Sequence, residues 1–244
     1  MTITLYQFPI SHYCEKVRWA LDYKGVRYRI KNLLPGQHIG FVKSVAPKTH
    51  VPVIEKDGEF IQGSAAIITW LDEQYPDKPL TPSDPAAREE ALEWERFADE
   101  GMGDDVRRWC YFTLLEHPRA VLPLLTTGVP LPLRIVFRLM FPKVREVMQR
   151  AMKIYPETSQ KSAAALDAAL QKLLKATDER KFLAGDQFSR ADLAVAALLS
   201  PFFMPPEYGV KWPRQAPQPL QGWVDARAGK LAWAERIYRE YRKA

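Results

Sequence analysis

The chain has 244 residues, of which 47% are hydrophobic and 26% are charged, a balance typical of globular proteins. This composition excludes disorder of the whole chain, and two cysteines, Cys14 and Cys110, are too few for a disulfide-stapled secreted scaffold. The N-terminal residues lack the basic start, apolar run and small-residue cleavage site of a signal peptide, so we expect a cytoplasmic protein.

The net charge of +6 is distributed in opposed blocks rather than in one basic patch. Residues 81–116 are acidic, residues 117–153 are basic, and no basic stripe carries interleaved aromatic residues. We therefore expect no nucleic-acid partner, and the absence of zinc-ligand spacing predicts no metal site. The most apolar stretch, residues 120–141, contains three prolines and two arginines, which argue against a membrane-spanning helix. Peripheral contact with a membrane surface stays open.

Short strand-like runs alternate with helical patterns in residues 1–76, which we predict to form one mixed α/β domain. Runs of β-branched and aromatic residues mark the strands, and apolar residues three or four apart mark the helices. Gly25 is placed to end the first helix. The predicted order is strand 3–8, helix 13–24, strand 26–30, helix 39–45, strand 51–54, strand 59–61 and helix 64–74.

A proline-rich break at residues 77–85 predicts a linker, and an all-helical domain is expected over residues 86–244. Six prolines make residues 201–219 a long irregular connection. The predicted helices are 86–100, 133–154 with a kink at Pro142, 159–177, 189–199, and one or two helices over 220–241 with a break at Gly229.

The turn Ser11-His12-Tyr13-Cys14 lies between the first predicted strand and helix. Ser11 is placed to be the N-cap of that helix, with its hydroxyl oxygen accepting from a backbone N–H. The same helix end presents free N–H groups and a positive dipole, which stabilise an anion and lower the pKa of a bound thiol. Ser11 would then donate its hydroxyl proton to the thiolate of a ligand. Cys14 is either a packed, inert thiol or a redox-active one.

Two further element starts carry groups that suit a small peptide ligand. Val51-Pro52 begins a predicted strand, where a cis peptide would leave the Val51 backbone free to pair with a ligand's backbone. Ser64, which follows Gly63, is either an N-cap or part of a carboxylate site at the start of the third helix. Three such starts on one side of a small sheet would form a cradle of peptide size.

This order of elements, the Ser11–Cys14 turn, the Val-Pro step and the Gly-Ser helix start together resemble the cytosolic glutathione transferases. The resemblance implies a thioredoxin-like N-terminal domain with a mixed four-stranded sheet, an all-α C-terminal domain, glutathione as co-substrate and a homodimer. It also implies a glutathione thiolate, stabilised by Ser11, that attacks an electrophilic apolar small molecule. Residues from about 117 to 157 look inserted relative to compact members of that family.

The resemblance also assigns site residues one by one. The expected glutathione contacts are His12, His38, Lys43, His50, Val51, Pro52, Gln62, Gly63 and Ser64. The expected walls of the second-substrate pocket are Ile10, Met102, Trp109, Tyr111 and Phe112. Ser189 and Asp192 form a capping box whose role is in folding.

The chain departs from that family at the γ-glutamyl end of the site. The family usually has Glu or Gln directly before the serine, whereas here Gly63 stands there and Gln62 lies one step early. Asp99 of a dimer partner is one candidate for the missing contact to the γ-glutamyl ammonium group. Alternatively, Asp99 is simply a charged residue on the surface. Two alternative functions stay open: a glutathione-dependent reductase or lyase that uses Cys14, and a non-catalytic interaction or membrane-peripheral protein.

Overall fold

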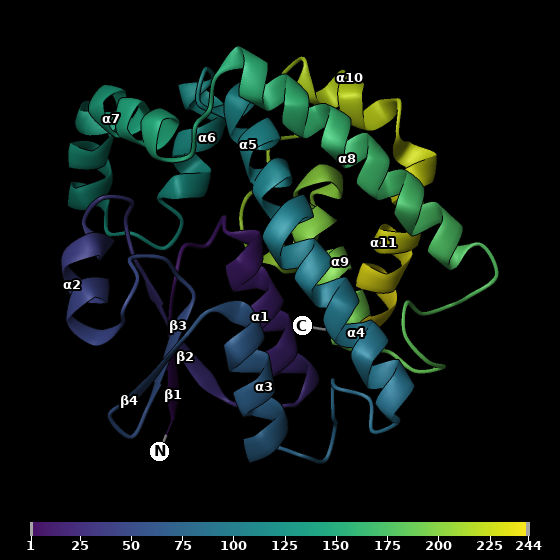
Figure 1. Cartoon of the computed structure of the whole chain (residues 1–244). Coiled ribbons are helices and arrows are strands. Elements are labelled where there is room, and N and C mark those ends of the chain that lie inside the picture. Colours follow the sequence, from purple (N-terminus) through teal and green to yellow (C-terminus); the bar gives the residue numbers. More distant parts are fainter. Residues whose placement is uncertain (1, 243–244) are drawn as a thin grey trace.

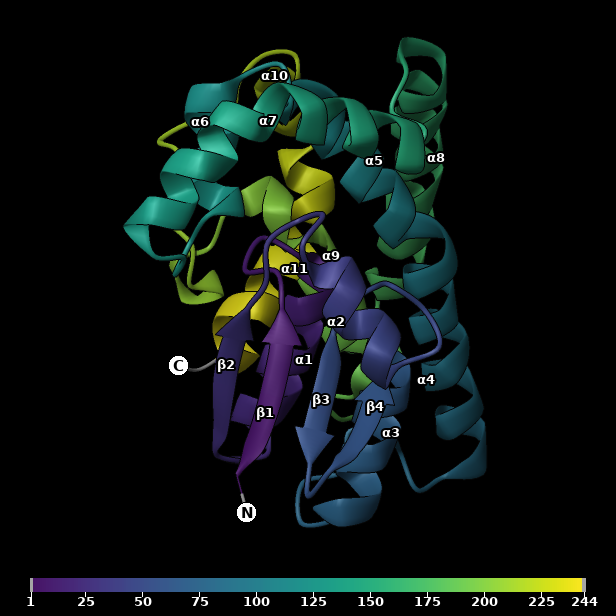
Figure 2. The ribbon, with the colours of Figure 1, turned by 90° about the vertical axis from the view of Figure 1, so that its left-hand side faces the viewer.

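Four strands form one mixed sheet near the N-terminus of the chain, whose residues 2–242 are described by a computed structural model (Figure 1). The strands are β1 (Ile3–Gln7), β2 (Tyr28–Asn32), β3 (Val53–Lys56) and β4 (Glu59–Gln62), in the order β2-β1-β3-β4. β1 is parallel to β2, and β3 is antiparallel to both β1 and β4. Figure 2 shows that β1 points toward the helical part of the molecule, so the turn after β1 lies between the two parts.

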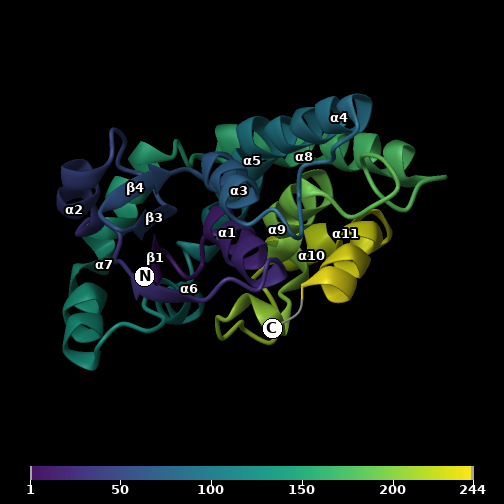
Figure 3. The ribbon, with the colours of Figure 1, turned by 90° about the horizontal axis from the view of Figure 1, so that it is seen from below.

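Three helices cover the sheet. α1 (His12–Tyr23) and α3 (Ser64–Gln74) lie on one face, and α2 (His38–Val45) lies on the other (Figure 3). Val17 and Leu21 of α1 are fully buried in the main core, whereas Val42 of α2 belongs to a smaller cluster. The predicted fold class, a thioredoxin-like mixed sheet followed by an all-helical part, is confirmed.

The chain is helical over most of its remaining length. A π-helical turn at Ala98–Met102 joins α4 to α5, and a short 3-10 helix, η2, covers Pro206–Tyr208. The α-helices are α4 (Pro85–Phe97), α5 (Gly103–Leu114), α6 (Pro118–Leu125), α7 (Leu131–Ala151), α8 (Pro156–Thr177), α9 (Arg190–Phe203), α10 (Leu220–Asp225) and α11 (Ala228–Tyr241).

One continuous core joins the sheet-bearing part to the helical part. α9 is buried along nearly its whole length and packs against α1, α4 and α11. Trp19 of α1 stacks on Phe188, with ring centroids 5.7 Å apart, and meets Tyr238 of α11 at 4.8 Å. The first helix is therefore fixed from both sides, by its own sheet and by the helices that follow it.

Several predicted boundaries are wrong. α9 runs through Pro201 to Phe203, because a proline removes a single N–H from the helix and the buried apolar face continues past it. The break predicted at Gly229 lies instead at residues 226–227, and Gly229 falls in the first turn of α11. α5 and α6 lie where no helix is predicted. The helix expected over 133–154 is present as α7, which begins and ends slightly earlier and contains Pro142.

Candidate active site

A cavity of about 350 Å³ lies between the end of β1 and the helical part of the molecule. Part of its wall comes from the turn before α1 and from residues 49–51, and the rest includes α5, α6, α7 and the segment after α9. The lining is largely apolar, with polar side chains from Ser11, His12, His38, His50 and Arg107 among it. Such a lining, at the junction of two packed parts, suits a small organic ligand.

Ser11 lines this cavity and is the N-cap of α1, as predicted. Its extended backbone lets Ser11 Oγ accept a hydrogen bond from the Cys14 N–H at 3.3 Å. Because the oxygen is the acceptor in that bond, the hydroxyl proton can still be donated to a ligand. A hydroxyl donor beside the N–H groups of a helix start is an arrangement that can bind an anion such as a thiolate.

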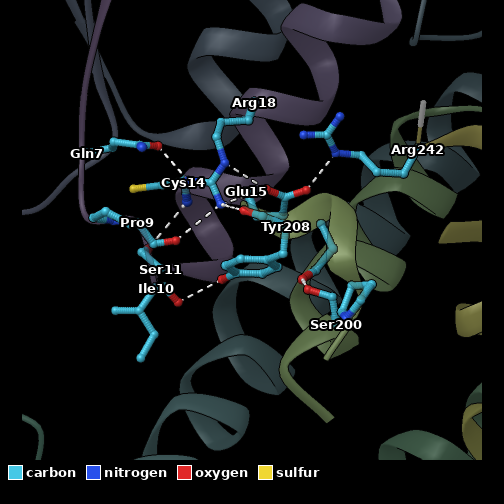
Figure 4. Close-up of polar contacts among 12 residues, drawn as sticks. Gln7, Pro9, Ile10, Ser11, Cys14, Glu15, Arg18, Ser200, Tyr208 and Arg242 are labelled. Carbon is cyan, nitrogen blue, oxygen red and sulfur yellow. Dashed lines mark hydrogen bonds and ion pairs between the residues drawn. The ribbon is translucent and has the colours of Figure 1, made fainter. Parts of the chain in front are cut away.

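The turn that carries Ser11 is held by side chains from both parts of the chain (Figure 4). Arg18 of α1 donates to the Pro9 carbonyl oxygen at 3.2 Å. Tyr208, in the short helix after α9, donates its hydroxyl proton to the Ile10 carbonyl oxygen at 2.7 Å. The position of Ser11 therefore depends on the C-terminal part of the chain as well as on α1.

Glu15, in the first turn of α1, carries a negative charge that would oppose an anion at this helix start. Its carboxylate pairs with Arg18 at 2.6 Å and with Arg242 at 2.7 Å (Figure 4). It also accepts the Tyr238 hydroxyl proton at 2.6 Å. These partners neutralise Glu15 within the protein, so the positive end of α1 remains available to a ligand.

Cys14 has a different environment from Ser11. Its side chain is fully buried and does not line the cavity. Burial raises the pKa of the Cys14 thiol, against smaller effects of the Ser11 hydroxyl and Arg18 that lower it. A buried neutral thiol is a poor nucleophile, so the geometry favours Ser11 over Cys14 as the group that meets a ligand.

His12 and Arg107 reach the cavity from different parts of the chain. The His12 side chain is only 5% exposed, and its Nε2 has no hydrogen-bond partner among residues 2–242. Burial and the nearby positive charge of Arg107 lower the pKa of His12 to about 3, so His12 is neutral at pH 7. Arg107 itself pairs with Asp104 at 2.7 Å.

Arg107 is a cavity residue that reasoning from the sequence missed. It follows two aspartates in α5, and that local pattern is equally typical of a solvated helix face. Only the folded structure shows that Arg107 lines the same cavity as the turn before α1. Cys110, one turn further along α5, also lines the cavity, and burial raises the pKa of its thiol to about 12.

The predicted glutathione contacts divide into two groups. Those that line the cavity are His12, His38, His50 and Val51, and the Val51-Pro52 peptide bond is cis. Those that lie outside the cavity lining are Lys43, Pro52, Gln62, Gly63 and Ser64.

The Gln62 side chain is hydrogen-bonded to the loop that precedes β3. Its side-chain oxygen accepts from the Lys48 N–H at 3.1 Å, and its amide group donates to the His50 carbonyl oxygen at 2.7 Å. Gln62 thereby fixes the backbone beside Val51 instead of presenting its amide to the cavity. Lys43 is exposed near the end of α2, and it forms no ion pair within residues 2–242.

The start of α3 differs from the prediction. Gly63 is the N-cap residue, and Ser64, for which an N-cap is one of two interpretations, is the buried first residue of the helix. Gly63 has φ +96°, a conformation that glycine adopts without strain and side-chain-bearing residues rarely adopt. Asp99 pairs with Lys16 of its own chain at 2.7 Å, so its carboxylate is already neutralised.

The predicted second-substrate residues also divide. Ile10 and Tyr111 line the cavity. Met102, Trp109 and Phe112 do not line it, because their faces of the helix turn toward other packing partners. Trp109, for example, stacks on Phe112 at 5.9 Å between ring centroids and meets Trp223 at 6.1 Å.

The predicted capping box before α9 is present. Asp192 Oδ2 accepts from the Ser189 N–H at 2.9 Å, and Ser189 Oγ accepts from the Ala191 N–H at 3.3 Å. Asp192 Oδ1 also accepts from the Leu183 N–H at 2.8 Å, which ties the preceding loop to the helix start. These contacts fit a role in folding.

Within residues 2–242, none of the helices has both the length and the apolar character needed to cross a bilayer. In the same part of the chain, no group of three or more His, Cys, Asp or Glu side chains is placed to hold a metal ion.

Two family models match the chain. "Glutathione S-transferase, N-terminal domain" matches residues 5–79, and "Glutathione S-transferase, C-terminal domain" matches residues 131–228. A probable maleylacetoacetate isomerase of Caenorhabditis elegans is 39% identical over 89 residues, which are 36% of this chain and 42% of that protein. The chain thus spans about two fifths of the length of the curated relatives that it matches.

Solved structures match over nearly the whole chain. Human glutathione S-transferase T1-1 in its apo form has a TM-score of 0.65 and 21% identity, over 99% of this chain and 84% of that one. A glutathione S-transferase of Methylobacterium radiotolerans, in complex with glutathione sulfonate, has a TM-score of 0.62 and 19% identity, over 99% and 92%. The N-terminal and C-terminal domain models of one family match in the expected order, and together they cover well over half of the residues. This chain therefore belongs to the glutathione S-transferase family.

Proposed function

We propose that this protein is a glutathione transferase that joins the glutathione thiolate to an electrophilic, largely apolar small molecule. One observation carries the proposal: Ser11, at the N-terminus of α1, lines an apolar cavity with a hydroxyl that can donate to a sulfur ligand. The family membership supports glutathione as the source of that sulfur.

In the proposed reaction, the glutathione thiol lies at the N-terminus of α1. The helix dipole, the first-turn N–H groups and the Ser11 hydroxyl lower the pKa of that thiol, so its proton is released to water. The thiolate sulfur then forms a bond to the electrophilic carbon of the second substrate, whose leaving group departs with the electron pair. Arg107 supports this step, because its positive charge in the cavity wall favours the thiolate over the thiol.

We assign the glycyl end of glutathione to the side of the cavity formed by His38, His50 and Val51, and the γ-glutamyl carboxylate to Ser64. Gly63 supplies no side chain for the γ-glutamyl ammonium group, and Asp99 is paired with Lys16. We therefore expect weak glutathione binding, in the millimolar range. A homodimer and a cytoplasmic location belong to the proposal on family resemblance alone.

Replacing Ser11 and Cys14 separately tests this proposal. With glutathione and a chlorodinitrobenzene as substrates, Ser11→Ala is expected to lower kcat/KM about 10²-fold, because it removes a hydrogen-bond donor to the reacting charge. Ser11→Thr keeps a hydroxyl and a helix cap, and is expected to retain most of the activity. Cys14→Ala is expected to change kcat/KM little, because Cys14 does not line the cavity.

The opposite result would assign the reaction to Cys14. If Cys14→Ala were inactive and Ser11→Ala fully active, the protein would be a thiol-dependent reductase or lyase. Calorimetric titration with millimolar glutathione separates a third case. No binding heat and no shift in melting temperature would exclude the enzyme and leave a non-catalytic protein of this fold.

A further inference from the structure

Exposed large hydrophobic side chains concentrate on α7. Leu131, Ile135 and Leu139 are 65%, 54% and 77% exposed, and their four-residue spacing places them in one stripe along the helix. Of the residues of α7, only Phe137 and Phe141 are buried. A helix that merely covers a protein core has a polar outer face, so this apolar outer face requires another explanation.

The N-terminal half of α7, which carries this stripe, also has positive charges that the acidic side chains of the protein do not neutralise. The sequence contains no acidic residue between Glu116 and Glu146. Arg134 and Arg138 lie one turn apart beside the apolar stripe, both are exposed, and no ion pair joins either of them to another residue within 2–242. The cations further along the helix are different, since Lys143, Arg145 and Arg150 all pair with glutamates.

α7 is also placed where a large flat partner can reach it. Figures 1 and 2 show α6 and α7 at one extremity of the molecule, next to α2 and away from the core helices α9 and α11. Met148 and Ala151, at the other end of α7, line the cavity. A partner bound to the outer face of α7 would therefore lie close to the cavity of the candidate site.

We propose that the N-terminal half of α7 docks in the plane of a membrane surface that contains anionic phospholipids. Leu131, Ile135 and Leu139 enter the boundary between headgroups and acyl chains, and Arg134 and Arg138 bind the phosphate groups beside them. This inference goes beyond the proposed function and does not depend on it.

Charge distinguishes a membrane from a second copy of the chain as the occupant of this face. A symmetric dimer through the outer face of α7 would bring the same acid-free segment of two copies together. Arg134 and Arg138 of one copy would then lie near the corresponding arginines of the other, and like charges in an interface are unfavourable. An anionic bilayer supplies the missing negative charge.

Vesicle flotation with the full chain tests the proposal. We expect binding to phosphatidylcholine vesicles that contain about 30% phosphatidylserine, and little binding to phosphatidylcholine alone. The double variant Ile135→Ser/Leu139→Ser is expected to lower the affinity at least about tenfold. Arg134→Gln/Arg138→Gln is expected to lower it about twentyfold at physiological salt. All four side chains are exposed, so the folded protein should persist.

Matched controls remove the same kinds of groups elsewhere. Ile30→Ser removes an apolar side chain that is 49% exposed on β2, and Arg88→Gln/Lys175→Gln removes two exposed cations, on α4 and near the C-terminal end of α8. Both controls are expected to bind vesicles like the wild type. The proposal is overturned if phosphatidylserine does not increase binding, or if the α7 variants bind as well as the controls. It is also overturned if the α7 variants only convert a dimer to a monomer in sedimentation velocity, which would identify a protein interface.

Discussion

Ser11 and Cys14 lie one helical turn apart, and their surroundings assign them different roles. Ser11 is at the cavity with its oxygen bound to the Cys14 N–H, whereas Cys14 is buried with a raised thiol pKa. The sequence predicts the N-cap, because the requirement for a hydroxyl at a helix start is local. The burial of Cys14 follows from contacts with distant segments, so the sequence left its role open.

His12 is the residue whose ionisation should be most visible in the stability of the protein. Its pKa is lowered to about 3 in the folded protein from an ordinary value of 6.5, so the unfolded chain binds more protons between these pH values. Stability is therefore lost as the pH falls through this window. Between about pH 8 and pH 5, wild type should lose about 2 kcal/mol more unfolding free energy than His12→Phe.

Urea unfolding of wild type and His12→Phe at a series of pH values checks this prediction. Phe keeps the ring contact with Tyr13 and cannot be protonated. The other titrating groups are common to both proteins and cancel in the difference. Parallel pH profiles for the two proteins would show that His12 is not buried in its neutral form.

At the scale of elements, the start of α9 connects the two parts of the chain. Arg190 pairs with Glu95 of α4 at 2.6 Å and donates to the Thr69 hydroxyl of α3 at 3.1 Å and to the Thr81 hydroxyl at 3.0 Å. Arg190 is only 3% exposed. A single buried guanidinium thus links α3, α4 and α9, in addition to their apolar packing.

Arg190→Met should destabilise the protein by about 3 kcal/mol, because it breaks a buried ion pair and leaves buried acceptors unmatched. Arg180→Met is the matched control, since Arg180 makes a similar pair with Glu90 at 2.7 Å but at an exposed position. That control should lose about 1 kcal/mol or less. Equal losses in urea unfolding would mean that the buried network does not stabilise the junction.

At the scale of the whole molecule, patterns that are local in sequence predict the structure well. The strands, α1, α3 and the capping box of α9 follow from residue spacing and caps, and these fix the fold class. The cavity is different, because Arg107 of α5 and the turn at Ser11 come to line it only when the helical part packs against the sheet-bearing part. The hydrogen bonds of Gln62 were likewise not predictable, because Gln62 ends β4 and its partners Lys48 and His50 lie in the loop before β3.

The charge blocks of the sequence also acquire meaning at this scale. Two members of the acidic block, Glu95 and Asp99, pair with Lys16 and Arg190, whereas others, among them Glu89, Glu93 and Glu100, stay exposed. Part of the basic block stays exposed on α7, next to apolar side chains. The net charge of +6 is therefore less informative than the place of its unpaired cations.

The ultraviolet absorbance of the bound glutathione thiolate, titrated against pH, tests the central claim most directly. If Ser11 and the N-terminus of α1 stabilise the thiolate, the apparent pKa of bound glutathione in wild type lies at least about one unit below the ordinary thiol value near 8.5. In Ser11→Ala it should return most of the way to that value. An unshifted thiol in wild type, or an equal shift in Ser11→Ala, would contradict the role assigned to Ser11.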